Sequence, residues 1–165
     1  MAAYIQPQRF KFLPFIISIL ITLSIGGVAS FFTLPQIKGW YVYLHKPSFN
    51  PPNWLFGPVW TLLYIMMGVA AYLIWQQRAR RVKYGQARNI YLLQLLFNFS
   101  WSIVFFGMHQ ILAALVVIVL LWVSIVVNIV LFGRINKTAA WLLVPYLLWV
   151  SFASVLNFAI YILNK

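Results

Sequence analysis

Residues 89–133 read NIYLLQLLFNFSWSIVFFGMHQILAALVVIVLLWVSIVVNIVLFG, 45 positions without one charged side chain. A helix needs about 20 apolar residues to cross the ~30 Å hydrocarbon core of a bilayer. This window is therefore too long for one crossing and long enough for two. The only polar turn within it, Gly107-Met108-His109-Gln110, predicts the break between them. We expect membrane-spanning helices over residues 89–107 and 111–132.

The charges elsewhere in the chain delimit three further charge-free windows. The first lies between Lys11 and Lys38 and predicts a span over 12–34. The second predicts a span over 57–76, because Pro51 and Pro52 disfavour an earlier helical start. The third predicts a span over 139–163, with Pro145 near its start, where a kink is tolerated. The fold class is thus an all-α membrane protein, a five-transmembrane-helix antiparallel bundle in a single domain over 1–165, with one long connection over 35–56.

The composition supports this class and excludes several functions. The chain is 64% hydrophobic and 7% charged, whereas a soluble domain is about 25% charged. It contains no Asp, Glu or Cys. Carboxylate-pair hydrolysis, Ser-His-Asp triads and redox thiols are therefore unavailable. An ion-coupled transporter is disfavoured because no intramembrane carboxylate or Lys is present to carry a coupling ion.

The basic residues predict the orientation in the membrane. Nine of the twelve lie at the end of the bundle that carries the N-terminus, and three, Lys38, Lys46 and Lys165, lie at the other. By the positive-inside rule, which applies to insertion into a cytoplasmic-type bilayer such as the expected bacterial cell membrane, we expect the N-terminus in the cytoplasm. Because the cations flank membrane spans, we expect contact with anionic lipid headgroups and no nucleic-acid partner.

Aromatic and polar residues recur at helical spacing within the predicted spans. Trp149, Ala153, Leu156, Asn157 and Ile160 share one face of the last span, and Trp60 and Tyr64 share a face of the second. Such polar residues are explained by interhelical hydrogen bonds or by a ligand cavity, and spacing alone leaves both open. The two histidines, His45 and His109, are isolated, so no metal site is predicted.

Three segments carry a resemblance to a known family. They are residues 40–75, WYVYLHKPSFNPPNWLFGPVWTLLYIMMGVAAYLIW; residues 94–110, QLLFNFSWSIVFFGMHQ; and residues 140–164, AWLLVPYLLWVSFASVLNFAIYILN. Together they resemble the tryptophan-rich sensory protein family, TspO/MBR, which is related to the translocator protein or peripheral-type benzodiazepine receptor. The resemblance covers nearly the whole chain from about Ser18.

The resemblance implies a homodimer of five-helix subunits, with residues 35–56 as a lid over a pocket inside the bundle. It implies binding of porphyrins such as protoporphyrin IX and haem as ligands, with no obligatory cofactor. The implied ligand-binding residues, with Tyr64 added from its spacing, are Trp40, Tyr41, Trp60, Tyr64, Trp101, Trp149, Ala153, Leu156 and Asn157.

The leading hypothesis is a membrane receptor or carrier that holds a tetrapyrrole against Trp60 and Trp149, with Asn157 bonding a polar edge. Its propionates would reach Lys38, His45 and Lys46 at the mouth. The alternative is light-dependent porphyrin degradation with Trp60 and Trp149 as the catalytic residues. A sterol binder is less favoured, since Phe158 stands where the family's sterol segment has Tyr.

Overall fold

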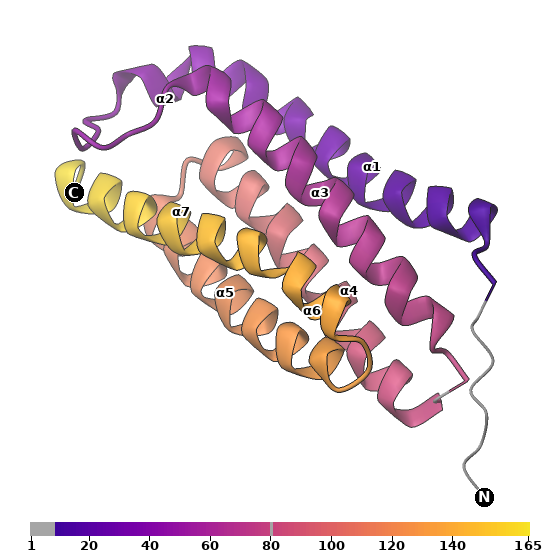
Figure 1. The fold of residues 1–165 in the computed structure, drawn as a ribbon. Coiled ribbons are helices and arrows are strands. Elements are labelled where there is room, and N and C mark those ends of the chain that lie inside the picture. The colour runs from indigo at the N-terminus through magenta and orange to yellow at the C-terminus, as the bar shows by residue number, and fades with distance from the viewer. Residues whose placement is uncertain (1–8, 80) are drawn as a thin grey trace, which may run out of the picture.

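The computed structural model describes residues 9–79 and 81–165, a part of the chain built from helices and turns without a strand. Five helical segments in it are long and apolar enough to cross a membrane: Phe12–Lys38, Asn53–Gln76, Val82–Gly107, Ile111–Gly133 and Lys137–Leu163. They run up and down the molecule side by side (Figure 1). The all-α, five-helix antiparallel bundle predicted from the sequence is confirmed.

The elements in chain order are α1 (Phe12–Lys38), α2 (Trp40–Tyr43), α3 (Asn53–Gln76), α4 (Arg81–Ser102), the π-helical turn η1 (Ile103–Gly107), α5 (Ile111–Gly133), α6 (Lys137–Leu142) and α7 (Val144–Leu163). The packing is a closed ring. Helix α1 packs on α3, α3 on α6, α6 and α7 on α5, α5 on α4, and α4 with η1 returns to α1. Helix α2 and the end of α7 lie at one end of the bundle, and the α3–α4 connection lies at the other (Figure 1).

The prolines end fewer helices than the sequence predicts. Helix α1 continues through Pro35 to Lys38, and α3 begins at Asn53 instead of residue 57. Proline before the first turn costs no helical hydrogen bond, so α3 starts directly after Pro52. Pro35 lies in the last turn of α1, where its missing N–H removes one bond, and the Gly39 N–H still closes the turn on the Pro35 carbonyl at 3.0 Å. At Pro145 the break does occur, since α6 ends at Leu142 and α7 begins at Val144.

Helices α1 and α3 approach closely because small residues lie at their crossing. A Cβ added to Gly68 would stand 2.6 Å from the Ile19 Cα, and one added to Gly26 would clash with the Tyr64 ring. The Thr22 hydroxyl donates to the Tyr64 carbonyl at 2.7 Å across the same contact. Small residues allow van der Waals contact between backbones in a membrane, where lipid offers no hydrophobic drive for association. This contact positions Tyr64 beside α1.

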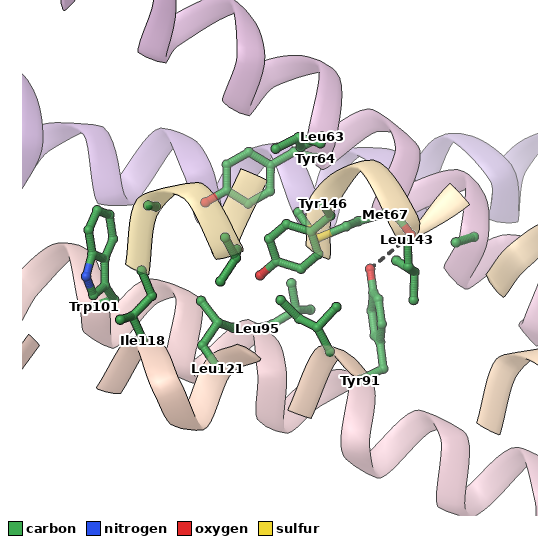
Figure 2. Packing of buried hydrophobic residues seen from close by; sticks show 14 of the residues in the cluster. Leu63, Tyr64, Met67, Tyr91, Leu95, Trp101, Ile118, Leu121, Leu143 and Tyr146 are labelled. Carbon is green, nitrogen blue, oxygen red and sulfur yellow. Dashed lines mark hydrogen bonds between the residues drawn. The ribbon is translucent and has the colours of Figure 1, made fainter. Parts of the chain in front are cut away.

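The core lies along the axis of the bundle and is filled mainly by α3, α4, α5 and α7. Met67, Ile118, Leu121 and Tyr146 are almost fully buried there (Figure 2). Large apolar side chains also cover the outside, where Phe31 is 78% and Leu148 65% exposed. An apolar exterior on this scale is suited to lipid rather than to water.

Candidate functional site

A partly open cavity of about 350 Å³ lies between α1, α2, α3 and the α4–η1 segment. Its aromatic lining residues are Tyr41, Phe56, Trp60, Tyr64, Trp101 and Phe106. Its small and hydroxyl-bearing lining residues are Gly26, Gly27, Ala29, Ser30, Thr33, Gly57, Thr61 and Ser102. The volume falls in the lower part of the ~300–1,000 Å³ range of small-molecule sites. The cavity therefore has aromatic side chains on α3 and α4 on one side and small side chains of α1 on the other.

Local helix geometry places the aromatic wall. Trp60 and Tyr64 are one turn apart on α3, and their rings stack with centroids 5.6 Å apart and planes 30° apart. On the α4 side, the Phe106 ring stands edge-on to Trp101 at 5.9 Å. The π-helical turn η1 buries Phe105 and Phe106, two consecutive residues, and only Phe106 reaches the cavity. An extra residue in a turn re-aims the side chains that follow it, a common use of π-helical turns.

A chain of buried hydrogen bonds fixes the orientation of Tyr64. Its hydroxyl donates to Asn98 Oδ1 at 2.6 Å, and Asn98 Nδ2 donates to the Tyr146 hydroxyl at 3.0 Å. That hydroxyl donates in turn to Gln94 Oε1 at 2.9 Å. Tyr64 and Tyr146 both direct their hydroxyls into the bundle (Figure 2). The Tyr64 ring thus stands at the cavity wall while its polar end is bonded inside the core.

Trp101 is hydrogen-bonded to Asn157, the polar residue that the sequence places on one face of the last span. Its Nε1–H donates to Asn157 Oδ1 at 3.1 Å, and Asn157 Nδ2 donates to the Ile111 carbonyl at 3.0 Å. Asn157, Leu156 and Ala153 are buried in the core and are not among the cavity lining. Asn157 therefore supports the cavity through Trp101, and its role as a ligand contact stays a prediction.

Trp149 lies outside this cavity. It lines a separate apolar groove with Val59, Leu62 and Met66 of α3. Its ring contacts Phe56 edge-on at 6.1 Å, and it is Phe56 that reaches the cavity. The buried stripe of α7 runs through Tyr146, Val150, Ala153, Asn157 and Ile160, so Tyr146 is the aromatic that points inward. The prediction that Trp60 and Trp149 face one common slot does not match this arrangement.

Tyr146, which is fully buried and not among the cavity lining, is the residue supporting the site that sequence reasoning missed. Its ring stands edge-on to Trp60 at 6.2 Å, and its hydroxyl joins Asn98 to Gln94. The 4-3-4-3 spacing from Tyr146 to Ile160 is a signal that could have identified it.

The first loop contributes Tyr41 to the cavity. The Tyr41 hydroxyl donates to Asn50 Oδ1 at 2.7 Å, and burial raises the pKa of Tyr41 to about 12. The phenol is therefore neutral at physiological pH. Lys46 Nζ donates to the carbonyls of Tyr41, Val42 and Leu44 and lies 4.9 Å from the Tyr41 ring centroid. Lys46 thus closes the end of α2, whereas Lys38 is exposed beside the lining residue Ile37.

Two contacts anchor the first loop to the rest of the bundle. Asn164 at the end of α7 accepts from the His45 backbone N–H at 2.9 Å and donates to the His45 carbonyl at 2.8 Å. Trp40 stacks on His109 with ring centroids 4.3 Å apart, and the same imidazole bonds Gln36 at 3.0 Å. His109 adopts a φ of 56°, an uncommon conformation for a residue with a side chain. Trp40 therefore fastens the loop and is not among the cavity lining.

The chemistry available to the cavity follows from its lining. The described residues around it offer hydroxyls, aromatic faces and two indole N–H groups, of which that of Trp101 is already bonded to Asn157, with no carboxylate, imidazole or amine. No cluster of potential metal ligands occurs in residues 9–79 and 81–165. Such a lining suits binding of a flat apolar molecule better than acid–base chemistry.

Comparison with known proteins agrees with this architecture. The family model of the TspO/MBR family matches residues 18–163. The chain is 46% identical over 155 residues to the tryptophan-rich protein TspO of Archaeoglobus fulgidus, covering 92% of this chain and 97% of that protein. It is 48% identical over 142 residues to the protein of the same name in Chlorobaculum tepidum, covering 86% and 90%. It is 37% identical over 123 residues to the human translocator protein, covering 74% and 73%. The chain therefore belongs to the TspO/MBR family and, with its five long apolar helices, is an integral multi-pass membrane protein.

Proposed function

We propose that this protein is a membrane receptor or carrier for a tetrapyrrole such as protoporphyrin IX or haem, held in the cavity between α1, α3 and α4. The observation that carries the proposal is the wall of six aromatic rings around a partly open space inside the bundle. A planar macrocycle gains from stacking on such faces and from leaving water. Gly27 of α1 leaves room for its edge, because an added Cβ there would meet nothing within 4 Å.

Lys38, at the loop end of the cavity, suits the propionates of such a ligand because it is exposed and follows the lining residue Ile37. The hydroxyls of Ser30, Thr33 and Thr61 also line the space, but each donates to a carbonyl of its own helix. A carboxylate at this end would meet a cation near the membrane surface, whereas the macrocycle would stay among apolar side chains. The loop, with Tyr41 on its inner side, is suited to act as a lid.

The test is a titration of purified protein with protoporphyrin IX and with haem, followed by quenching of tryptophan fluorescence. Loss of one stacking ring is worth about 0.5–1.5 kcal/mol, so Trp60→Leu should weaken binding roughly 2- to 12-fold. Trp149→Leu is the matched control, because it removes an indole outside the cavity. We expect that control to change the Kd by less than about twofold.

The opposite pattern would overturn this assignment of the site. If Trp149→Leu weakened binding and Trp60→Leu did not, the ligand would occupy the α3–α7 groove. If neither pigment bound the wild type, the proposed function itself would fail. Illumination of the complex separates binding from the alternative, light-dependent degradation: bleaching no faster than that of free pigment in the same detergent leaves a binder.

A further inference from the structure

A second apolar groove, of about 400 Å³, lies at the end of the bundle opposite the first loop. It runs between the beginning of α1, the end of α3 and the beginning of α4. Its walls include Leu13, Ile17, Leu92 and Leu95, and Arg88 is the cation among its lining residues. No described residue lines both this groove and the aromatic cavity. The groove is therefore a separate feature of the molecule.

A basic hollow adjoins this groove at Trp75. The hollow has a volume of about 160 Å³ and is lined by Arg9, Lys11, Trp75, Gln76 and Arg78. Trp75 also lines the apolar groove, so one indole forms a wall of both. The Arg78 guanidinium lies 3.8 Å from the Trp75 ring centroid, and Lys11 Nζ lies 5.9 Å from it. The apolar groove thus leads to the positive charges of the hollow.

Neighbouring contacts hold these cations in place. The Lys11 backbone N–H donates to the Tyr72 hydroxyl at 2.7 Å, and the Phe10 and Phe15 rings both pack edge-on to the same tyrosine. Arg78 Nη1 donates to the Trp75 carbonyl at 3.3 Å. The hollow is therefore supported by packing on both α1 and α3.

The chain has no acidic side chain to neutralise these charges. It contains no Asp and no Glu against twelve Lys and Arg. Arg9, Lys11, Arg78 and Arg88 therefore require an anion from outside the chain for pairing. A free phosphate would use the hollow and leave the adjoining groove empty. A molecule with an anionic head and a long apolar tail would use both.

We propose that this groove and hollow bind one anionic phospholipid. The phosphate lies near Lys11 and Arg78, with Arg88 on the groove side, and one acyl chain follows the groove between α1 and α4. Trp75 lies at the level where head and tail meet, which suits the amphipathic indole. Basic pockets between membrane helices attract anionic headgroups by the same electrostatics.

Native mass spectrometry of the full chain in neutral detergent tests the proposal, with phosphatidylglycerol and phosphatidylcholine of identical acyl chains as probes. We expect one phosphatidylglycerol bound at least about fivefold more tightly, since one Lys or Arg near an anionic headgroup contributes about a fivefold factor. Arg78→Gln should reduce that affinity about fivefold, and Lys11→Gln with Arg78→Gln about 25-fold. Lys137→Gln is the matched control, because Lys137 is exposed at the same end and lines neither feature.

Ile17→Trp tests the acyl-chain part, because it fills the groove without changing the charge. Ile17 is 45% exposed, so the larger ring is expected to be tolerated, and Leu92→Trp at a 54% exposed position repeats the test. Both should lower phosphatidylglycerol binding at least fivefold while circular dichroism stays unchanged. Equal binding of the two lipids, equal loss in Lys137→Gln, or full displacement by inorganic phosphate would overturn the proposal. The proposal would also be overturned if the Ile17→Trp and Leu92→Trp variants still bound the lipid and lost only the ability to pair with a second copy of the chain.

Discussion

Gly26 and Gly27 are neighbours in α1 that have opposite surroundings. A Cβ at Gly26 would clash with the Tyr64 ring, whose hydroxyl is bonded to Asn98, whereas a Cβ at Gly27 meets nothing within 4 Å. Gly26→Ala should therefore destabilise the bundle by about 1–3 kcal/mol, as overpacking does. Gly27→Ala should be neutral or stabilising by up to about 1 kcal/mol, because alanine is the better helix former. Reversible unfolding in mixed detergent measures both, and equal effects would contradict the close contact between α1 and α3.

The hydrogen bond from Trp101 to Asn157 leads to a second prediction at the scale of single residues. Polar bonds between membrane helices contribute about 0.6 kcal/mol on average and up to about 1.7. A double-mutant cycle of Trp101→Phe and Asn157→Leu should give a coupling free energy in that range. The cycle separates this bond from the one that Asn157 donates to the Ile111 carbonyl. A coupling of zero would mean that Trp101 is held by packing alone.

At the level of elements, the sequence predicts the number of spans well and their inward faces less well. Charges are costly at membrane depth, so the charge-free windows delimit five helices. The inward face of α7 depends on its neighbours. Trp149 and Tyr146 each start a series of residues at helical spacing that could form the inward face. Tyr146 is the one that is buried, because α4 offers it Asn98 and Gln94 as hydrogen-bond partners.

The π-helical turn η1 and the α1–α3 contact also lie beyond single-sequence reasoning. The residues of η1, IVFFG, carry no signal for an extra residue in the turn, yet that turn buries both Phe105 and Phe106. The Trp60–Tyr64 part of the cavity was predictable from its one-turn spacing. The facing wall was not, because it depends on which glycine of α1 meets α3.

The contact between α7 and the first loop leads to a prediction for the loop. Asn164 makes two hydrogen bonds to the His45 backbone. Each such bond contributes about 1 kcal/mol, so Asn164→Ala should raise amide exchange in residues 44–50 by roughly tenfold or more. Hydrogen exchange measured by mass spectrometry reports this directly. Asn53→Ala, at an exposed position that begins α3, is the control. Unchanged exchange in the loop would mean that its other contacts, the Trp40–His109 stack and the Phe49–Phe152 pair among them, hold it without Asn164.

At the scale of the whole molecule, positive charge is concentrated at one end of the bundle. That end carries the α3–α4 and α5–α6 connections, and the aromatic cavity lies toward the opposite end, under the first loop. Of the nine basic residues counted there, Arg80 lies outside the described residues. The two ends therefore differ in chemistry: one suits anionic headgroups, and the other suits entry of a ligand between α1 and the loop.

This asymmetry predicts the orientation in a cell membrane. Nine cations against three place the N-terminal end in the cytoplasm by the positive-inside rule, so the first loop should face outward. The chain has no Cys, which allows single reporters without background. In bacterial cells, Ser48→Cys in the exposed loop should react with a membrane-impermeant maleimide while the cells are intact. Lys83→Cys, exposed near the start of α4, should react only after permeabilisation. The reverse pattern would contradict the orientation, and labelling of both sites in intact cells would mean that the chain inserts in two directions despite its charge bias.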